Sequence, residues 1–218
     1  MTLKLAIGNK NYSSWSMRPW LALRANDIAF EEVFIPLYTG DADKQRIFAV
    51  TRSGKVPALI DGDVTVWDSL AIIEYLAERF PDARLWPENR ASRAHARSIS
   101  AEMHSGFMAL RNECPMNLHR SVRAIALSED ARTNIARIQA IWLECRERHG
   151  KRGPFLFGAF GAADAMFAPV VYRFRSFAIE VASEVQAYMD TMLALPAVQE
   201  WTKAGLAETL LIDRVEAI

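Results

Sequence analysis

Two adjacent serines, Ser13 and Ser14, stand directly before the first helical pattern of the chain. The sequence predicts a helix over residues 17–25 with Ser16 as its N-cap. The first N–H groups of a helix lack internal partners and its N-terminus is electropositive, so this end stabilises an anion, and a nearby hydroxyl can add a hydrogen bond. A thiolate is the anion with chemical consequences, because lowering a thiol pKa by about two units from about 8.5 takes only about 2.7 kcal/mol. Helix capping without any chemistry explains the same serines.

Two later segments carry groups that suit a peptide-like ligand. Val56 and Pro57 open a short strand, and a cis peptide bond between them would leave the Val56 backbone groups free to bind a ligand. Asp68 and Ser69 precede a helix predicted over residues 69–80. Ser69 and the helix terminus suit a carboxylate and Asp68 suits an ammonium group, which is the charge pair of an α-amino acid head. Capping of the helix again explains the same two residues.

The elements that must position these residues alternate between strand and helix. Short apolar runs predict strands over residues 3–8, 30–37, 57–60 and 64–66, and the Asp61-Gly62-Asp63 segment between the last two is a strong hairpin signal. Helical patterns cover residues 17–25, 43–50 and 69–80, the last with apolar residues recurring at intervals of three and four. This order predicts a four-stranded sheet with helices on both faces, in which the first two strands are parallel.

The second half of the chain shows helical patterns and no strand patterns. Residues 82–89 are charged, contain Pro87 and read as a linker. Nothing after them resembles a strand pair, and five helices are predicted, over residues 90–112, 128–149, 162–178, 184–195 and 198–207. The expected domains are therefore residues 1–81, an α/β unit, and residues 90–218, an all-α unit, joined by the linker.

Composition excludes several classes of partner. Lys and Arg number 26 and Asp and Glu number 26, so the net charge of zero gives no broad attraction to nucleic acid or anionic lipid. No run approaches the length of a membrane span and no signal peptide is apparent, and the two distant cysteines, Cys114 and Cys145, suit a reducing compartment. The four histidines lack the spacing of metal ligands. We expect a cytoplasmic protein without a metal.

The order of these segments resembles the cytosolic glutathione S-transferase family. The most specific part is the stretch GKVPALIDGDVTVWDSLAIIEYLAERFP, which looks like the glutathione-binding segment of that family, while SSWSMRPWLAL is similar to its serine-type, zeta-like members. The resemblance covers the whole chain. It implies a thioredoxin-like N-terminal domain, an all-α C-terminal domain, glutathione as co-substrate and a homodimer.

The resemblance also implies a role for individual residues. Ser13 would match the hydroxyl that stabilises the glutathione thiolate, with Ser14 as the competing candidate. The glutathione site would be formed by residues of three segments: Trp15, Lys55, Val56, Pro57, Asp68 and Ser69. Within it, Val56 would pair with the cysteinyl backbone beside a cis Pro57, Asp68 and Ser69 would hold the γ-glutamyl head, and Lys55 would approach the glycyl carboxylate. The second substrate would lie against the helix over residues 90–112, near Met103, Phe107, Met108 and Arg111.

The chain departs from the zeta-type maleylacetoacetate isomerases at two positions. Trp15 stands where those enzymes carry cysteine, and Met108 stands where they carry glutamine, so both positions argue against that isomerisation. Near residue 162, Gly161 replaces the usual Ser or Thr cap, and Asp164 is expected to be structural, accepting hydrogen bonds from backbone N–H groups.

The leading hypothesis is a transferase that directs the glutathione thiolate at a small hydrophobic electrophile or a peroxide. Three alternatives stay open: a module that binds glutathione or another ligand without turnover, a protein-interaction module on the same fold, and a glutathione-dependent isomerase of the maleylacetoacetate type. Thiol–disulfide chemistry would normally require a cysteine in place of Ser13 or Ser14.

Overall fold

A four-stranded mixed sheet forms the first half of the computed structural model, which describes residues 2–37 and 40–218. Strands β1 (Leu3–Ile7), β2 (Phe30–Phe34), β3 (Ala58–Asp61) and β4 (Val64–Val66) lie in the order β2-β1-β3-β4. The pair β1 and β2 is parallel, with Leu3 opposite Phe30, and the other two pairs are antiparallel. The predicted strands, their parallel first pair and the hairpin are confirmed.

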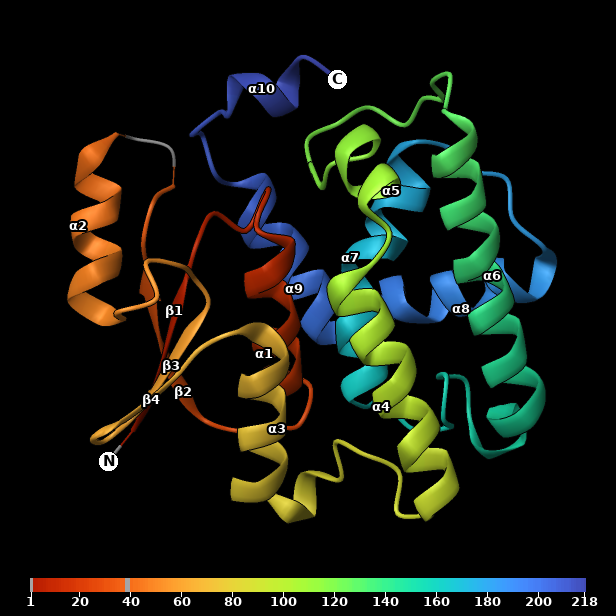
Figure 1. Ribbon diagram of the computed structural model, residues 1–218, viewed down its shortest axis with the longest axis horizontal. Helices are drawn as coiled ribbons and strands as arrows, with labels where there is room; N and C mark the ends of the chain where they lie inside the picture. The colour runs from red at the N-terminus through yellow and green to blue at the C-terminus, as the bar shows by residue number, and fades with distance from the viewer. Residues whose placement is uncertain (1, 38–39) are drawn as a thin grey trace.

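Helices cover both faces of this sheet (Figure 1). Helices α1 (Ser14–Arg24) and α3 (Ser69–Arg79) lie side by side on the face that meets the rest of the molecule, whereas α2 (Asp41–Val50) lies on the opposite face. The chain crosses between the parallel strands through α1, as the connection of two parallel strands requires. The α/β half is thus the sheet with helices on both faces that the order of elements predicts, and it has the thioredoxin-like arrangement that the resemblance implies.

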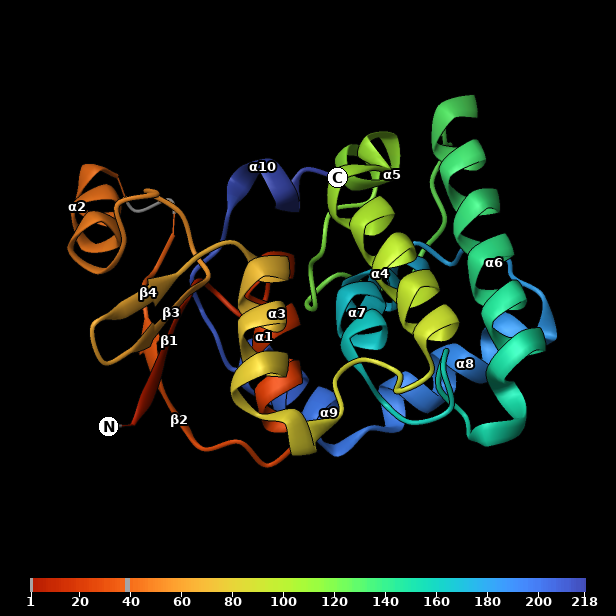
Figure 2. The same ribbon diagram turned by 60° about the horizontal axis from the view of Figure 1, so that its bottom comes forward.

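The second half is entirely helical. A short 3-10 turn, η1 (Pro81–Ala83), and the linker lead into helices packed beside α1 and α3 (Figure 2). Their bounds are α4 (Arg90–Ser105), α5 (Met108–Glu113), α6 (Glu129–His149), α7 (Ala162–Ser176), α8 (Ser183–Ala194), α9 (Pro196–Leu206) and α10 (Asp213–Glu216), with a second 3-10 turn, η2 (Gly150–Arg152), after α6.

The most buried helix, α7, joins the two halves. Of its fifteen residues only Arg175 is not buried, and it packs against α1 on one side and α4 on the other (Figure 2). One hydrophobic cluster runs through this contact, from Leu5 in the sheet to Trp142 on α6 and Trp201 on α9. This core is therefore shared by one face of the sheet and the helical half, whereas a second, smaller cluster of Ala6, Ile35, Ile47 and Ala58 joins the other face of the sheet to α2.

The prediction of one helix over residues 90–112 is wrong. The helix stops at Ser105 because Gly106 is extended, with φ −105° and ψ −168°, and Phe107 has a left-handed backbone, with φ 62°. A Cβ at Gly106 would lie 2.8 Å from the Glu102 carbonyl oxygen, so only glycine fits this break. The apolar spacing continues across the break, so periodicity alone did not reveal it. With this additional helix and the short α10 (Asp213–Glu216), the described residues beyond the linker hold seven α-helices, not five.

Asp164 has the structural role that its position predicts. Its carboxylate is buried and accepts hydrogen bonds from the N–H groups of Leu156 and Gly161, both at 3.0 Å, and from the Tyr188 hydroxyl at 3.1 Å. Burial raises the pKa of Asp164 to about 6, against the effect of these hydrogen bonds. No helix among residues 2–37 and 40–218 has the length and apolar character needed to span a membrane.

Candidate functional site

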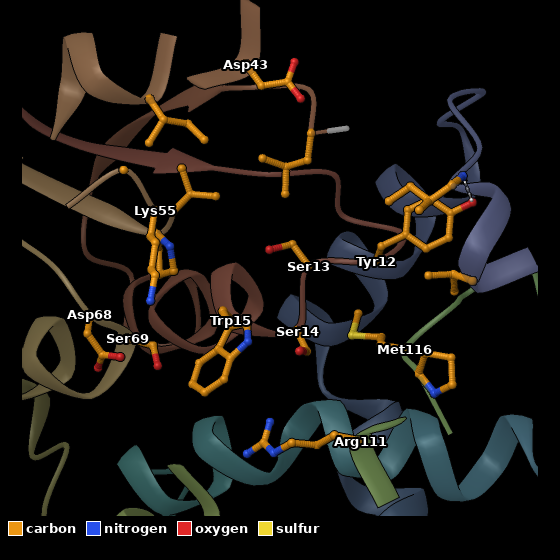
Figure 3. Close-up of a pocket in the computed structure, with 18 of the residues that line it drawn as sticks. Tyr12, Ser13, Ser14, Trp15, Asp43, Lys55, Asp68, Ser69, Arg111 and Met116 are labelled. Atoms are coloured by element: carbon orange, nitrogen blue, oxygen red, sulfur yellow. Dashed lines mark hydrogen bonds between the residues drawn. The ribbon is translucent and has the colours of Figure 1, made fainter. Parts of the chain in front are cut away.

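A cavity of about 1010 Å³ lies where the sheet half meets the helical half (Figure 3). One wall comes from the loop between β1 and α1, the segment before β3 and the start of α3. The other wall comes from α4, α5, α7 and the chain end around α10. The cavity therefore collects the segments singled out in the sequence, together with distant segments that were not.

Ser13 is the N-cap of α1. The helix begins three residues earlier than predicted, so the expectation of Ser16 as the cap is wrong and Pro19 lies inside the helix. The Ser13 hydroxyl donates to Ser16 Oγ at 2.8 Å and accepts from the Ser16 N–H at 3.3 Å, while Gly8 N–H donates to Ser16 Oγ at 3.1 Å. Figure 3 shows the hydroxyl pointing into the cavity. Ser13 thus places an alcohol oxygen at the electropositive end of a helix.

Ser14 also lines the cavity, but its oxygen is engaged by the other wall. It accepts a hydrogen bond from Arg173 Nη2 on α7 at 3.4 Å. Arg173 donates in addition to the carbonyl oxygens of Arg111 and Cys114. Both serines thus have hydrogen-bond partners inside the protein: Ser13 is the helix cap, and Ser14 accepts from Arg173. The choice of Ser13 over Ser14 as the hydroxyl that meets a ligand stays a prediction.

The segment before β3 lies across the cavity from Ser13. Lys55, Val56 and Pro57 all line it, and the Val56–Pro57 peptide bond is cis. Lys55 is exposed and its N–H donates to Ser53 Oγ at 3.2 Å, so its ammonium extends from a fixed backbone. This arrangement presents backbone groups and a cation to the same space.

At the start of α3, capping and ligand-facing geometry occur together. Asp68 is the N-cap and accepts from the Leu70 N–H at 2.8 Å, yet it also lines the cavity beside Ser69. Its second oxygen lies 3.2 Å from His104 Nε2 on α4. Burial lowers the pKa of His104, so this imidazole is neutral at physiological pH. The sequence did not point to His104, because it stands alone on an otherwise ordinary helix.

Of the residues expected to contact a second substrate, only Arg111 lines the cavity. Met103 and Phe107 are buried in the core, and Met108 is exposed. The break at Gly106 explains the difference, because α5 begins after it and places Arg111, not Met108, against Trp15 in the cavity. Trp15 and two residues beyond α5, Pro115 and Met116, form the apolar part of the wall instead.

Two arginines flank Trp15, and a third contacts the neighbouring Ser14. The guanidinium carbons of Arg18 and Arg111 lie 4.4 Å and 5.0 Å from the Trp15 ring centre, and Arg173 lies beneath Ser14. Arg18 is fully buried; it donates to Ser69 Oγ at 3.4 Å, and its Nε and Nη2 find no hydrogen-bond partner within the described part of the chain. Burial, followed by repulsion from the other arginines, lowers the pKa of Arg18 well below its usual range and that of Arg173 to about 9. The cavity wall that holds Arg111 and Arg173 is therefore strongly receptive to negative charge.

The end of the chain closes one side of the cavity. Ile212, Arg214 and Val215 line it, and the Ile212 N–H donates to the Tyr12 hydroxyl at 3.3 Å, the bond drawn in Figure 3. Tyr12 in turn donates to the Glu216 carboxylate. Burial and Glu216 raise the pKa of Tyr12 to about 12, so this phenol stays protonated. No pattern in residues 207–218 signalled such a contact.

The two cysteines do not take part in the site. Both are buried, and burial raises the pKa of Cys114 to about 11 and that of Cys145 to about 12. Neither is a nucleophile at neutral pH. Residues 2–37 and 40–218 contain no group of three or more His, Cys, Asp or Glu side chains that could hold a metal ion.

Known proteins with similar sequences share both halves of the chain. A family model for the N-terminal domain of glutathione S-transferases matches residues 12–79, and one for the C-terminal domain matches residues 118–204. A probable maleylacetoacetate isomerase from Caenorhabditis elegans is 29% identical over 189 residues, or 85% of this chain and 86% of that protein. The maleylacetoacetate isomerase of Rattus norvegicus is 37% identical over 100 residues, about half of each chain.

Solved structures show the same fold. A glutathione transferase homolog from Burkholderia, crystallised with bound glutathione, superposes with a TM-score of 0.73 and 24% identity, covering 95% of this chain and 100% of the other. A Tau class glutathione S-transferase from mango superposes with a TM-score of 0.69 and 18% identity, covering 99% and 96% of the two chains.

Proposed function

This chain belongs to the glutathione S-transferase family, and on that premise we propose that it binds glutathione, ionises its thiol and directs the thiolate at an electrophile. The proton of the thiol leaves to solvent. The sulfur then forms a bond to an electrophilic carbon, and a leaving group departs with the bonding pair, or the sulfur adds to a double bond. Reduction of a peroxide would follow the same first step.

The observation that carries this proposal is the Ser13 hydroxyl at the start of α1, facing a cavity whose other groups match the rest of a tripeptide. Val56 offers backbone groups to the cysteinyl unit, and Asp68 with Ser69 offers a carboxylate, a hydroxyl and a helix terminus to the γ-glutamyl head. Lys55 suits the glycyl carboxylate. The Burkholderia homolog of the same fold carries bound glutathione, which supports this assignment.

The opposite wall bears on the electrophile. A small hydrophobic electrophile fits Trp15, Pro115 and Met116, but Arg111 and Arg173 add positive charge to the same wall. An electrophile with both an apolar body and a carboxylate uses all of these groups, because a buried guanidinium gains most from a charged partner. We therefore expect negatively charged electrophiles to be preferred over neutral ones of similar size.

A glutathione-dependent isomerase of the maleylacetoacetate type is the second candidate. The arginines favour it, since the named substrate is an acid, and so do the isomerase relatives. The Met108 departure carries less weight than the sequence suggested, because Met108 is exposed and does not line the cavity. Trp15 remains the argument against it, since a bulky indole between Arg18 and Arg111 replaces the small cysteine of those enzymes.

The proposed division of the chain is a glutathione-binding domain over residues 1–81, a linker over residues 82–89 and a helical domain over residues 90–218.

We also propose a cytoplasmic homodimer with a role in detoxification. Exposed apolar side chains on the α/β half, such as Phe48 and Trp67, support an association with a second copy. Light scattering during gel filtration measures the mass in solution, and a monomer at all concentrations would refute the dimer.

Titration of the bound thiol tests the central claim. Ultraviolet absorbance of the thiolate, recorded against pH for glutathione bound to the protein, is expected to give a midpoint about two units below that of free glutathione. Steady-state rates with a chloronitroaromatic, a peroxide and a carboxylate-bearing electrophile separate the reaction types. Tight glutathione binding with an unshifted thiol and no rate above background would identify a binding module instead.

A further inference from the structure

The loop that carries Ser13 is anchored by a residue almost two hundred positions later. The backbone N–H groups of Lys10 and Asn11 donate to the two carboxylate oxygens of Glu208, at 2.7 Å and 3.0 Å. Glu208 follows the end of α9, where the chain turns back toward the cavity, and Figure 1 shows this segment rising to α10 on the same side as the N-terminal end of α1. A single side chain thus satisfies two consecutive peptide groups of the loop.

The helical half holds the same loop at further points. Trp201 Nε1 on α9 donates to the Lys10 carbonyl oxygen at 3.0 Å, and Asn11 Oδ1 accepts from the N–H groups of Leu118 at 2.6 Å and His119 at 3.2 Å. A Cβ at Gly205 would lie 3.2 Å from Asn11 N, so the end of α9 fits closely against the loop.

The charged end of Lys10 is also fixed. Its Nζ lies 2.7 Å from a carboxylate oxygen of Glu32, and 5.1 Å and 5.6 Å from the ring centres of Trp20 and Trp201. The Lys10 ammonium therefore has its partners on β2, α1 and α9. The Glu208 carboxylate therefore binds the N–H groups of Lys10 and Asn11 and not the Lys10 ammonium.

Two backbone hydrogen bonds connect the anchored part of the loop to Ser13. The Asn9 carbonyl oxygen accepts from the N–H groups of Tyr12 at 3.2 Å and Ser13 at 2.8 Å, which closes the loop into a tight turn. Lys10 and Asn11 are the residues at the tip of that turn. A displacement of their peptide groups therefore moves the backbone of Ser13, and a hydroxyl that stabilises an anion must be placed to within about half an ångström.

We propose that Glu208 is a positioning residue for thiol activation: its carboxylate binds the Lys10 and Asn11 N–H groups and so keeps the Ser13 hydroxyl where the glutathione sulfur ionises. The inference rests on the proposed function. A carboxylate is required because it offers two acceptor oxygens to two neighbouring donors. Glutamine of the same size offers one oxygen and opposes the second N–H with another donor.

The direction of the effect separates positioning from simple electrostatics. A negative charge near the sulfur disfavours the thiolate, so removing the Glu208 charge by itself would lower the thiol pKa. Loss of the loop geometry weakens the hydrogen bond from Ser13 to the thiolate and therefore raises the thiol pKa. The two explanations thus predict opposite shifts for the same substitution.

The test compares Glu208→Gln with Glu200→Gln. Glu200 is the matched control, because it is a glutamate of the same part of the chain, on α9, that pairs with Arg24 at the end of α1 far from Ser13. For Glu208→Gln we expect the midpoint of the bound thiol to rise by about one unit, kcat/KM at neutral pH to fall about tenfold, and the dissociation constant of glutathione to change less than threefold. Glu200→Gln should match the unaltered protein in all three measurements.

Three results would overturn the proposal. A thiol midpoint in Glu208→Gln that equals or falls below that of the unaltered protein shows that positioning is not its role. A loss of glutathione affinity equal to the loss of kcat/KM, with the midpoint unchanged, indicates a binding role. If the unaltered protein itself does not shift the thiol, the proposed function fails first, and that outcome is seen before any variant is made.

Hydrogen exchange on the unaltered protein gives an independent check that needs no variant. The Lys10 and Asn11 amides are expected to exchange at least tenfold more slowly than amides of an open loop, because both are bonded to Glu208. Exchange as fast as that of an unprotected peptide would refute the anchoring, even if Glu208→Gln failed to fold.

Discussion

The two walls of the cavity are built in different ways. The wall that we propose to face glutathione includes three short local motifs: a serine that caps α1, a cis Val56–Pro57 bond before β3, and Asp68 with Ser69 at the start of α3. The opposite wall is assembled from α4, α5, α7 and the chain end, with Arg111 and Arg173 as its charged groups. The first wall works through backbone groups and helix termini, and the second works through side chains.

The difference separates two tasks. Local motifs keep their geometry because each is completed within a few residues, so the wall proposed to activate the co-substrate depends little on the remainder of the chain. The side chains of the opposite wall depend on where helices break and how they pack, so this wall can vary with the electrophile. The loop before α1 is the exception, since Glu208, Trp201 and the backbone of residues 118–119 all link it to the helical half.

The largest effect should come from Ser13. For Ser13→Ala we expect kcat/KM to fall by about one to three orders of magnitude with glutathione affinity largely kept, because one charge-assisted hydrogen bond to the thiolate is lost. Loss of the cap should also cost about 1 kcal/mol of stability. Steady-state kinetics and thiol titration measure the first effect, with Ser14→Ala as the matched variant. If Ser14→Ala collapses activity while Ser13→Ala does not, the activating hydroxyl is on the residue bonded to Arg173.

Asp164 should matter for stability and not for the thiol. We expect Asp164→Ala to lower the free energy of unfolding by about 3 kcal/mol at neutral pH, since two buried N–H groups and the Tyr188 hydroxyl lose their acceptor. Denaturant unfolding measures the cost, and the bound thiol should titrate as before. A shifted thiol midpoint would show that the helical half reaches the activating wall through its core.

The same carboxyl gives a pH dependence of defined sign. The pKa of Asp164 is raised to about 6 in the fold from 3.8, so folding favours its protonated form. That contribution is fully present below about pH 4 and is lost as pH rises through about 6. The destabilisation caused by Asp164→Ala should therefore be larger at pH 5 than at pH 8.

Arg111 tests the selectivity of the second wall. For Arg111→Gln we expect kcat/KM to fall about tenfold to a hundredfold for a carboxylate-bearing electrophile and to change less than threefold for a neutral one. The ratio of the two rates is the measurement, because it cancels any general disturbance of the site. Equal losses for both electrophiles would contradict the idea that this wall selects negative charge.

The smallest effect should come from Asp68. For Asp68→Asn we expect KM for glutathione to rise about tenfold with kcat nearly unchanged, because the ammonium of the γ-glutamyl head loses a charged partner in both the ground state and the transition state. The amide can still cap α3 through its oxygen, so stability should change little. A fall in kcat at saturating glutathione would show instead that the His104 contact shapes the activating wall.

Predictions from the sequence were more accurate for the wall built from local motifs than for the opposite wall. The hairpin at Asp61-Gly62-Asp63 and the amphipathic helix after Ser69 are local, and the structure contains both. The cis bond at Pro57, which only the family resemblance implied, is present as well. The cap of α1 was misplaced because Ser13 and Ser16 are equally good capping residues in sequence. The choice between them is made by Gly8, whose N–H donates to Ser16 Oγ.

The opposite wall was largely beyond such reasoning. Met103, Phe107 and Met108 have the spacing of a helix face, but the extended backbone of Gly106 ends the helix before that face is completed. Arg173 and Glu208 reach the site from more than one hundred and fifty positions away, and nothing in their neighbouring residues indicates a partner. Contacts of that range are set by how helices pack, which periodicity does not encode.

The burial of α7 between α1 and α4 has a consequence for how the protein evolves and can be rebuilt. Because one core runs through both halves, the chain should melt in a single cooperative transition, and cutting the linker should not release an intact glutathione-binding unit. If the helical half is exchanged for that of a relative, the new helices must therefore pack against the hydrophobic surface of the α/β half. A chimera keeps its fold only if the incoming α7 reproduces the surface that meets α1.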